Sequence, residues 1–229
     1  MRKTALLCGA VVVAGLVAAG CERTAARPAK PPTQAVSDLV LPAEAAGAAV
    51  TGKHFVMNWL VLGPIPFKES DFGGDQQQPS ADHKFVKNEG GLDGSQTPPE
   101  GAAWQAKAFT SLQDDGRVDL DAFYNAADHV AAYAVAWLKC PTDVKNAKLY
   151  VGSDDYLKIW INGKLVHAYQ TERRAAEADQ DCVGGISLKQ GYNRVVVKCV
   201  DVVLGWDFYF RLTDAKDRPM LVKAAAKAE

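Results

Sequence analysis

Hydrophobic and polar residues alternate in several short segments of the chain. The clearest segments are residues 156–161 (YLKIWI) and 206–212 (WDFYFRL), in which every second side chain shares a face. Both alternating sets of residues 129–140 are apolar, which indicates a strand that is covered on both faces. Similar runs, separated by turn residues such as Asn162-Gly163, occupy residues 54–62, 147–151, 165–169, 183–188 and 192–200. Many short strands and no long helical period predict an all-β protein, either a sandwich or a barrel.

The faces of two strands predict the core. Leu157, Ile159 and Ile161 share one face of their segment, and Tyr156, Lys158 and Trp160 share the other. Trp206, Phe208, Phe210 and Leu212 form a second apolar face. Two such faces would interdigitate between two sheets. The polar stretch of residues 68–101 predicts a long irregular loop over one end of the sandwich, with a turn of helix near residues 82–88.

The N-terminus has the organisation of an export signal. Arg2 and Lys3 precede an apolar run and the small residues 18–20, and Cys21 follows directly. This arrangement resembles a bacterial lipoprotein signal, which implies that Cys21 is lipidated; an ordinary secretory signal with an incidental Cys21 is the alternative. We therefore predict a signal peptide at 1–20, an Ala/Pro-rich tether at 21–47, a domain at 48–214 and a C-terminal tail at 215–229, which forms a short helix or frays. Glu22 takes the place of a retention aspartate, which favours the outer membrane.

Charge and motif content narrow the function. The formal net charge is −1, which gives no electrostatic basis for binding nucleic acid. No catalytic fingerprint is present, and the four histidines are scattered without metal-ligand spacing. Acid pairs such as Asp114-Asp115 and Asp119 with Asp121 could serve glycoside hydrolysis, but acids at turns are more often solvated. The sequence therefore predicts a protein that is not an enzyme.

Six motifs together resemble the galactose-binding-like jelly-roll domains of carbohydrate-binding modules and of family 2 glycoside hydrolases. They are WLVLGPIPF (59–67), DDGRVDLDAFY (114–124), HVAAYAVAWLKCP (129–141), VGSDDYLKIWINGKLVH (151–167), LKQGYNRVVVKC (188–199) and GWDFYFRLTD (205–214). The resemblance implies a two-sheet antiparallel β-sandwich. Its implied function is non-catalytic carbohydrate recognition at the cell envelope. A structural module that binds an envelope protein, or an accessory domain of a glycan-processing enzyme complex, remains an alternative.

Aromatic side chains are the first candidates for a ligand site. Sugar rings stack on flat aromatic surfaces while neighbouring polar groups bind the hydroxyls. The candidate ligand-binding residues are Asp154, Asp155, Tyr156, Trp160, Asn162, Trp104 and Trp206. The alternative for each aromatic residue is burial beneath a loop or in a second core layer.

The adjacent acids Asp154 and Asp155 have two interpretations. In the structural one, which we favour, Ser153 and Asp154 close a turn after strand 147–151, and Asp155 is solvated or bonds a neighbouring loop. The SDD element also resembles PA14 lectin-like domains, in which such acids hold calcium. That resemblance implies a calcium site at Asp154 and Asp155, with Asn162 and loop carbonyls completing the shell, although Tyr156 replaces the usual glycine. No other cofactor is predicted.

Three cysteines lie in the predicted domain. A simple hairpin of residues 183–188 and 192–200 would oppose Cys182 and Cys199. The resemblance instead sends these two strands to opposite sheets. It implies a Cys140–Cys182 disulfide and leaves Cys199 as a buried free thiol that faces inward with Val195 and Val197.

Overall fold

The computed structural model describes residues 54–68, 82–110, 115–125, 128–220 and 223–225. The predicted signal peptide, Cys21 and the tether lie outside the described residues. No helix in these ranges has the length and apolar character needed to cross a membrane.

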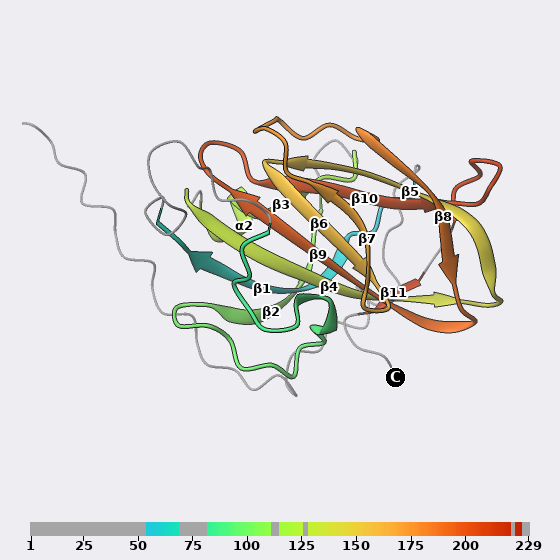
Figure 1. Cartoon of the computed structure of the whole chain (residues 1–229), viewed down its shortest axis with the longest axis horizontal. Coiled ribbons are helices and arrows are strands. Elements are labelled where there is room, and N and C mark those ends of the chain that lie inside the picture. Colours follow the sequence, from blue (N-terminus) through green and yellow to red (C-terminus); the bar gives the residue numbers. More distant parts are fainter. Residues whose placement is uncertain (1–53, 69–81, 111–114, 126–127, 221–222, 226–229) are drawn as a thin grey trace, which may run out of the picture.

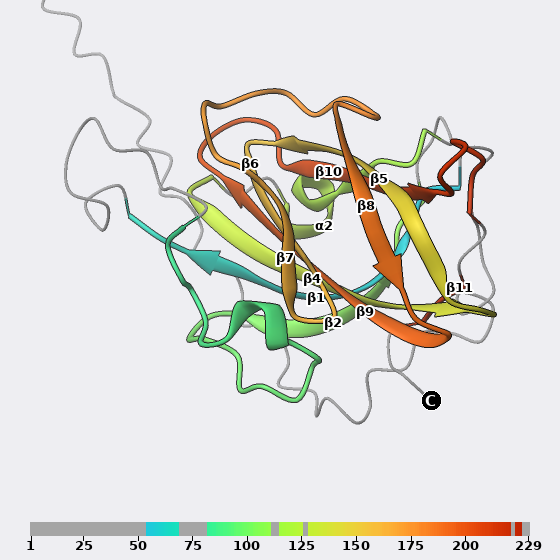
Figure 2. The ribbon, with the colours of Figure 1, turned by 45° about the vertical axis from the view of Figure 1, so that its right-hand side comes forward.

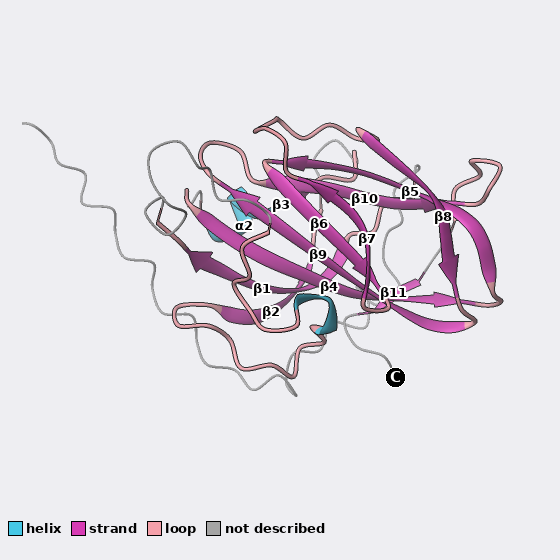
Figure 3. Ribbon diagram, in the orientation of Figure 1, coloured by secondary structure: helices cyan, strands magenta, loops and turns pink. Residues whose placement is uncertain are grey.

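Two antiparallel β-sheets pack face to face, as the alternating segments predict (Figures 1 and 3). The larger sheet has the order β2-β1-β4-β9-β6-β7, and β11 also pairs with β4; the smaller has the order β3-β10-β5-β8. Their bounds are β1 Asn58–Pro66, β2 Ala103–Ala108, β3 Val118–Asp119, β4 Val130–Cys140, β5 Val144–Asp154, β6 Tyr156–Ile161, β7 Lys164–Tyr169, β8 Asp181–Leu188, β9 Gly191–Asp201, β10 Asp207–Thr213 and β11 Lys223–Ala225. The described residues also form a short helix, α2, at Leu120–Tyr124.

The main core lies between the two sheets. Leu157, Ile159 and Ile161 of β6 contribute one side, and alternate residues of β10 contribute the other, as predicted. Trp59 of β1 contacts Phe208 and Phe210 edge to face, with ring centroids 5.3 and 5.5 Å apart. Aromatic pairs favour this geometry because the electropositive edge of one ring meets the electronegative face of the other.

A second apolar layer covers the outer face of the larger sheet. Residues 82–102 cross this face on the side away from β5 and β10 (Figure 2). The described part of the irregular segment predicted at 68–101 therefore covers a sheet face and not one end of the sandwich, and residues 69–81 of that segment lie outside the described residues. The turn of helix predicted near residues 82–88 lies directly after them, as a 3₁₀ helix at Glu89–Gly91 with Asn88 as its N-cap. The face of β4 and β9 is too apolar to be left in water, and this segment covers it with Leu92 and Phe85.

Buried charged groups attach residues 82–102, which we call the covering segment, to the larger sheet. The Glu89 carboxylate lies 2.7 Å from the Lys198 ammonium and accepts a hydrogen bond of 2.6 Å from the Tyr133 hydroxyl. Lys198 has no exposed side-chain surface, and its ammonium also donates to the His83 carbonyl. Burial lowers the pKa of Lys198 to about 8, against the opposing effect of Glu89.

Some elements differ from the sequence prediction. The strand expected at 147–151 extends to Asp154, so no turn follows Val151. β2, β3 and α2 were not predicted; α2 begins where the Asp119 carboxylate caps it by accepting a 2.8 Å bond from the Ala122 N–H. The tail adds strand β11 instead of a terminal helix.

The cysteines correct the predicted disulfide. Cys140, Cys182 and Cys199 are all free thiols. β8 and β9 do lie in different sheets, as the resemblance implied. However, Cys182 pairs in register with Tyr150, and the far end of β8, Leu188, pairs with Val144. Because Val144 follows closely after Cys140, the Cys140–Cys182 prediction is wrong: Cys182 lies at the opposite end of β8. Cys199 is buried in the main core with Val195 and Val197, as expected.

Candidate functional site

Acidic side chains gather at one end of the sandwich. Asp154 ends β5, Asp155 alone separates it from β6, and Asp201 ends β9. Asp207 begins β10 and pairs in register with Asp154 on one side and Asp119 on the other. Antiparallel pairing brings these residues together because the end of one strand lies beside the start of its neighbour. We call Asp121, Asp154, Asp155, Asp201 and Asp207 the acidic cluster.

Asp155 is anchored inside the cluster. Its residue is 3% exposed, and its Oδ2 accepts a 3.0 Å hydrogen bond from the Val202 N–H. Its own N–H donates to the Val200 carbonyl at 3.2 Å. The expected bond from Asp155 to a neighbouring loop is therefore present, whereas the turn expected at Ser153 and Asp154 is replaced by continuous strand.

Asp201 is the most deeply buried acid of the cluster. It has no exposed surface, and neither of its carboxylate oxygens has a hydrogen-bond partner among the described residues. One oxygen each of Asp121 and Asp207 is also buried without such a partner. Most buried polar groups in proteins are hydrogen-bonded, because an unpaired one costs about 1–3 kcal/mol and a charged one more. Such carboxylates therefore require either protons or a cation.

The pKa values of the cluster are raised. Burial first, and then Asp155 and Asp207, raise the pKa of Asp154 to about 7. Burial, followed by repulsion from Asp155 and other acids, raises the pKa of Asp201 to about 8. Burial also raises the pKa of Asp155 and Asp207. Both causes disfavour the charged form of a carboxyl group.

The loop between β9 and β10 borders the cluster. Asp155 holds this loop at Val202, and the Asp128 carboxylate accepts a 3.1 Å bond from the Leu204 N–H. A Cβ atom on Gly205 would lie 2.5 Å from Asp154 Oδ2, so only glycine allows the carboxylate to approach the main chain this closely. Leu204 has a φ of 79° and is 83% exposed.

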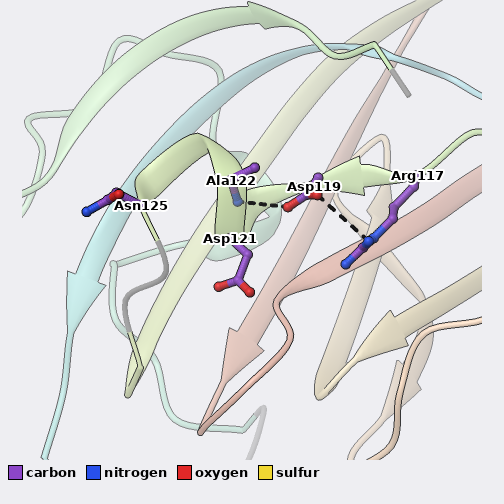
Figure 4. Close-up of a pocket in the computed structure, with 5 residues that line it drawn as sticks. All are labelled: Arg117, Asp119, Asp121, Ala122 and Asn125. Carbon is purple, nitrogen blue, oxygen red and sulfur yellow. Dashed lines mark hydrogen bonds and ion pairs between the residues drawn. The ribbon is translucent and has the colours of Figure 1, made fainter. Parts of the chain in front are cut away.

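A cavity of about 310 Å³ that is open to solvent lies beside the cluster at β3 and α2. Arg117, Asp119, Asp121, Ala122 and Asn125 line it, and Figure 4 shows Arg117 reaching towards Asp119 while Asp121 projects from the first turn of α2. Arg117 is held by a 2.5 Å hydrogen bond from its Nη2 to Oδ2 of the buried Asp207. The N–H groups of Leu120 and Asp121 both donate to the Trp206 carbonyl, which joins α2 to the loop at Gly205.

The four aromatic candidates do not form an exposed platform. Tyr156, Trp160 and Trp104 are 3%, 9% and 3% exposed, and Trp206 is fully buried. Trp160 and Trp104 belong to the apolar layer beneath the covering segment, and Gly90 packs directly against the Trp160 ring. Trp206 stacks on Tyr124 in the main core. The prediction of a sugar-stacking platform at these residues is therefore wrong and the alternative of burial is confirmed: Trp160 and Trp104 lie in the second apolar layer, and Trp206 lies in the main core.

Asn162 is also removed from the acidic residues. It follows the C-terminal end of β6, whereas Asp155 precedes the N-terminal end, so the whole strand separates them. Its carboxamide donates to Asn193 at 2.9 Å and accepts from the Arg194 N–H at 3.0 Å. Asn162 therefore fixes the turn before β7 and cannot share a metal ion with Asp154 and Asp155.

The cluster has the oxygen chemistry of a site for a hard cation such as calcium. No three Asp, Glu, His or Cys side chains of the described residues already converge in the arrangement of a metal site. Asp154, Asp155 and Asp201 would therefore have to move closer together to hold such a cation, with loop carbonyls completing its shell. The sequence motif pointed to Asp154 and Asp155; it missed Asp201 and Asp207, whose only signal is an acid at the end of a strongly apolar strand.

Comparison with known proteins reveals only distant likeness. No protein-family model and no curated relative matches the chain. A solved structure titled "PA14 sugar-binding domain from RTX adhesin" aligns with a TM-score of 0.35 and 16% identity, over 44% of this chain and 55% of that one. The PA14 domain of an antifreeze protein, MpAFP, aligns with a TM-score of 0.31 and 16% identity, over 44% and 53%. A GH31 α-xylosidase from Xanthomonas citri has a TM-score of 0.33 and 12% identity, over 54% and 14%. The alignments therefore span about half of each PA14 structure.

Proposed function

We propose that this protein is a non-catalytic envelope lipoprotein whose β-sandwich binds carbohydrate with the help of calcium held by Asp154, Asp155 and Asp201. The observation that carries the proposal is the Asp201 carboxylate, which is fully buried beside other acids with both oxygens unpartnered in the described structure. At neutral pH a bound divalent cation would satisfy this carboxylate and remove the repulsion within the cluster.

The link from calcium to carbohydrate is chemical. Calcium takes about six to eight oxygen ligands, and the three carboxylates supply only part of that number. Adjacent hydroxyl groups of a sugar are oxygen ligands with suitable spacing, and the cluster lies at an end of the sandwich beside the β9–β10 loop. The exposed Leu204 at its border would contact the apolar edge of a sugar ring. The proposal includes two further points. The domain is galactose-binding-like, and it binds sugar as the name of the RTX adhesin structure says of that domain.

The envelope location rests on the sequence. Cys21 directly follows a signal with small residues at 18–20, and the Ala/Pro-rich residues 21–47 would extend the domain from a lipid anchor. Glu22 favours the outer membrane. The absence of a catalytic fingerprint in the sequence supports a binding role for the domain.

Calcium binding is tested by thermal unfolding of the full-length chain in excess calcium and in excess EDTA. A ligand that binds only the folded state raises the melting temperature. We expect calcium to raise it by several degrees in the wild type and to have no effect in Asp201→Ala. Glu100→Gln, which removes an exposed charge far along the chain from the cluster, is the matched control and should respond like the wild type. Equal melting temperatures in calcium and EDTA would refute the proposal.

Carbohydrate binding is tested with a glycan array probed in calcium and in EDTA. We expect binding to at least one glycan that depends on calcium and is lost in Asp201→Ala. Calcium stabilisation without binding to any glycan would leave a structural metal site and reject carbohydrate recognition.

A further inference from the structure

We infer that the cavity between β3 and α2 is a second binding subsite, which takes a neutral, hydroxyl-rich sugar unit next to the acidic cluster. This inference rests on the proposed function, because it assigns the class of sugar that the domain recognises. The cavity of about 310 Å³ is at the lower end of the range for small-molecule sites, about 300–1,000 Å³.

The lining of the cavity matches hydroxyl groups. Asp119 and Asp121 supply carboxylate acceptors, and Arg117 supplies donors. The only apolar side chain of the lining is the methyl group of Ala122. A sugar hydroxyl both donates and accepts, so it can satisfy this mixture, whereas an apolar ligand would leave the polar groups unpaired.

The polar groups are held in place before a ligand arrives. Asp119 is fixed as the cap of α2 through Oδ1, which leaves its Oδ2 3.8 Å from Arg117 Nη1. Asp207, which is 4% exposed, holds the Arg117 guanidinium in place by accepting a hydrogen bond from it. One carboxylate oxygen of Asp121 has no hydrogen-bond partner in the described structure. This oxygen is buried and not exposed to the cavity, whereas the preorganisation of Asp119 and Arg117 reduces the entropy lost on binding.

The charge of the cavity selects a neutral ligand. Asp119 and Asp121 place two carboxyl groups at the cavity, and the one guanidinium, on Arg117, is already paired with Asp207. A uronate or another anionic sugar would therefore meet net repulsion from these carboxylates.

The position of the cavity makes it continuous with the acidic cluster. Asp121 belongs to both, and its N–H bonds the carbonyl of Trp206, the residue after Gly205. Gly205 in turn contacts the Asp154 carboxylate. A glycan bound at Asp154, Asp155 and Asp201 could therefore extend its next unit into the cavity.

The test is isothermal titration of the full-length chain in a detergent without a sugar headgroup, once in excess calcium and once in excess EDTA. The probes are the methyl glycosides of glucose, galactose and mannose, with glucuronate and galacturonate for comparison. We expect at least one neutral glycoside to bind and the uronates to bind more weakly. Ala122→Trp fills the cavity from an exposed position, so it should weaken that binding by about tenfold or more while the calcium-dependent rise in melting temperature stays unchanged.

Two further variants make the result decisive. Ala168→Trp places the same side chain on exposed β7 and should bind like the wild type. Asp121→Ala should also weaken binding, and it is expected to fold because the carboxylate oxygen that it removes has no partner. Failure of all three neutral glycosides to bind, tighter binding of a uronate, or unchanged binding in Ala122→Trp overturns the inference. Calcium-dependent binding that Ala122→Trp leaves intact retains the proposed function and rejects only the cavity. Binding that Ala122→Trp blocks but calcium does not affect supports the cavity and rejects the calcium site.

Discussion

The carboxylate of Asp155 accepts a 3.0 Å hydrogen bond from the main-chain N–H of Val202. This bond joins the β5–β6 connection to the β9–β10 loop, two segments that are distant in the sequence. Through this bond, Asp155 fixes the position of the loop that borders the acidic cluster.

Replacing Asp155 should destabilise the protein. Asp155→Ala leaves the buried Val202 N–H unpaired, so we expect a loss of about 1–3 kcal/mol in the free energy of unfolding in EDTA. Asp155→Asn keeps an oxygen acceptor and removes the charge, so it should cost less. Urea denaturation of the two variants measures the difference. Asp155→Asn as unstable as Asp155→Ala would show that the hydrogen bond to Val202 is not the main contribution.

The buried Glu89–Lys198 pair should stabilise the fold only when both charged residues are present. Glu89→Gln leaves the Lys198 ammonium buried without its counter-charge, and breaking such a pair costs about 3–5 kcal/mol. In a double-mutant cycle, the double variant Glu89→Gln/Lys198→Met should lose much less free energy of unfolding than the two single variants lose in sum. Arg218→Ala, at an ion pair whose arginine is 75% exposed, is the control and should cost about 0–1 kcal/mol. Additive single effects would contradict the coupling.

Stability without calcium should fall as the pH rises. Asp154 and Asp201 have folded-state pKa values of about 7 and about 8, above the ordinary value of 3.8. Between pH 3.8 and 8 the folded protein thus binds more protons than the unfolded chain. The stability that these groups contribute is fully present below pH 3.8 and is lost as the pH rises to about 8. We expect a lower melting temperature in EDTA at pH 8 than at pH 5, with a smaller difference in Asp201→Asn. An unchanged slope in that variant would assign the pH dependence to other groups.

The three cysteines of the domain should differ in reactivity. Cys182 is exposed, whereas Cys140 and Cys199 are buried and burial raises the pKa of both thiols. The thiolate is the reactive form, so an alkylating reagent should modify Cys182 in the folded protein and the other two only after unfolding. Peptide mapping by mass spectrometry identifies the modified residues. A Cys140–Cys182 disulfide in the purified chain would contradict the strand register.

Lipidation should depend on Cys21. Labelled palmitate fed to bacteria that express the chain should be incorporated, and Cys21→Ser should abolish incorporation. Cys182→Ser is the control, because it removes a thiol outside the signal. Equal labelling of Cys21→Ser and the wild type would favour the ordinary secretory signal.

The sequence by itself determined the strands other than β2, β3 and β11, and which of their residues face the main core. The alternation of Leu157, Ile159 and Ile161 places them on one side of β6, and the inward direction of Cys199 follows from the same period of two. It also marked Asp154 and Asp155 as unusual. These features are local, because side-chain direction along a strand is fixed by the backbone of that strand alone.

Only the tertiary structure decided what covers each face and which acids meet. Trp160 alternates as an exposed residue would, but residues 82–102 cover its face and complete a second apolar layer. Asp201 reaches Asp154 and Asp155 because β9 pairs with β6 and β10 pairs with β5. Cys182 lies away from Cys140 because of the register between β5 and β8. Each of these results depends on pairing between segments far apart in the chain, which is set by the joint burial of both faces and not by the pattern of either segment.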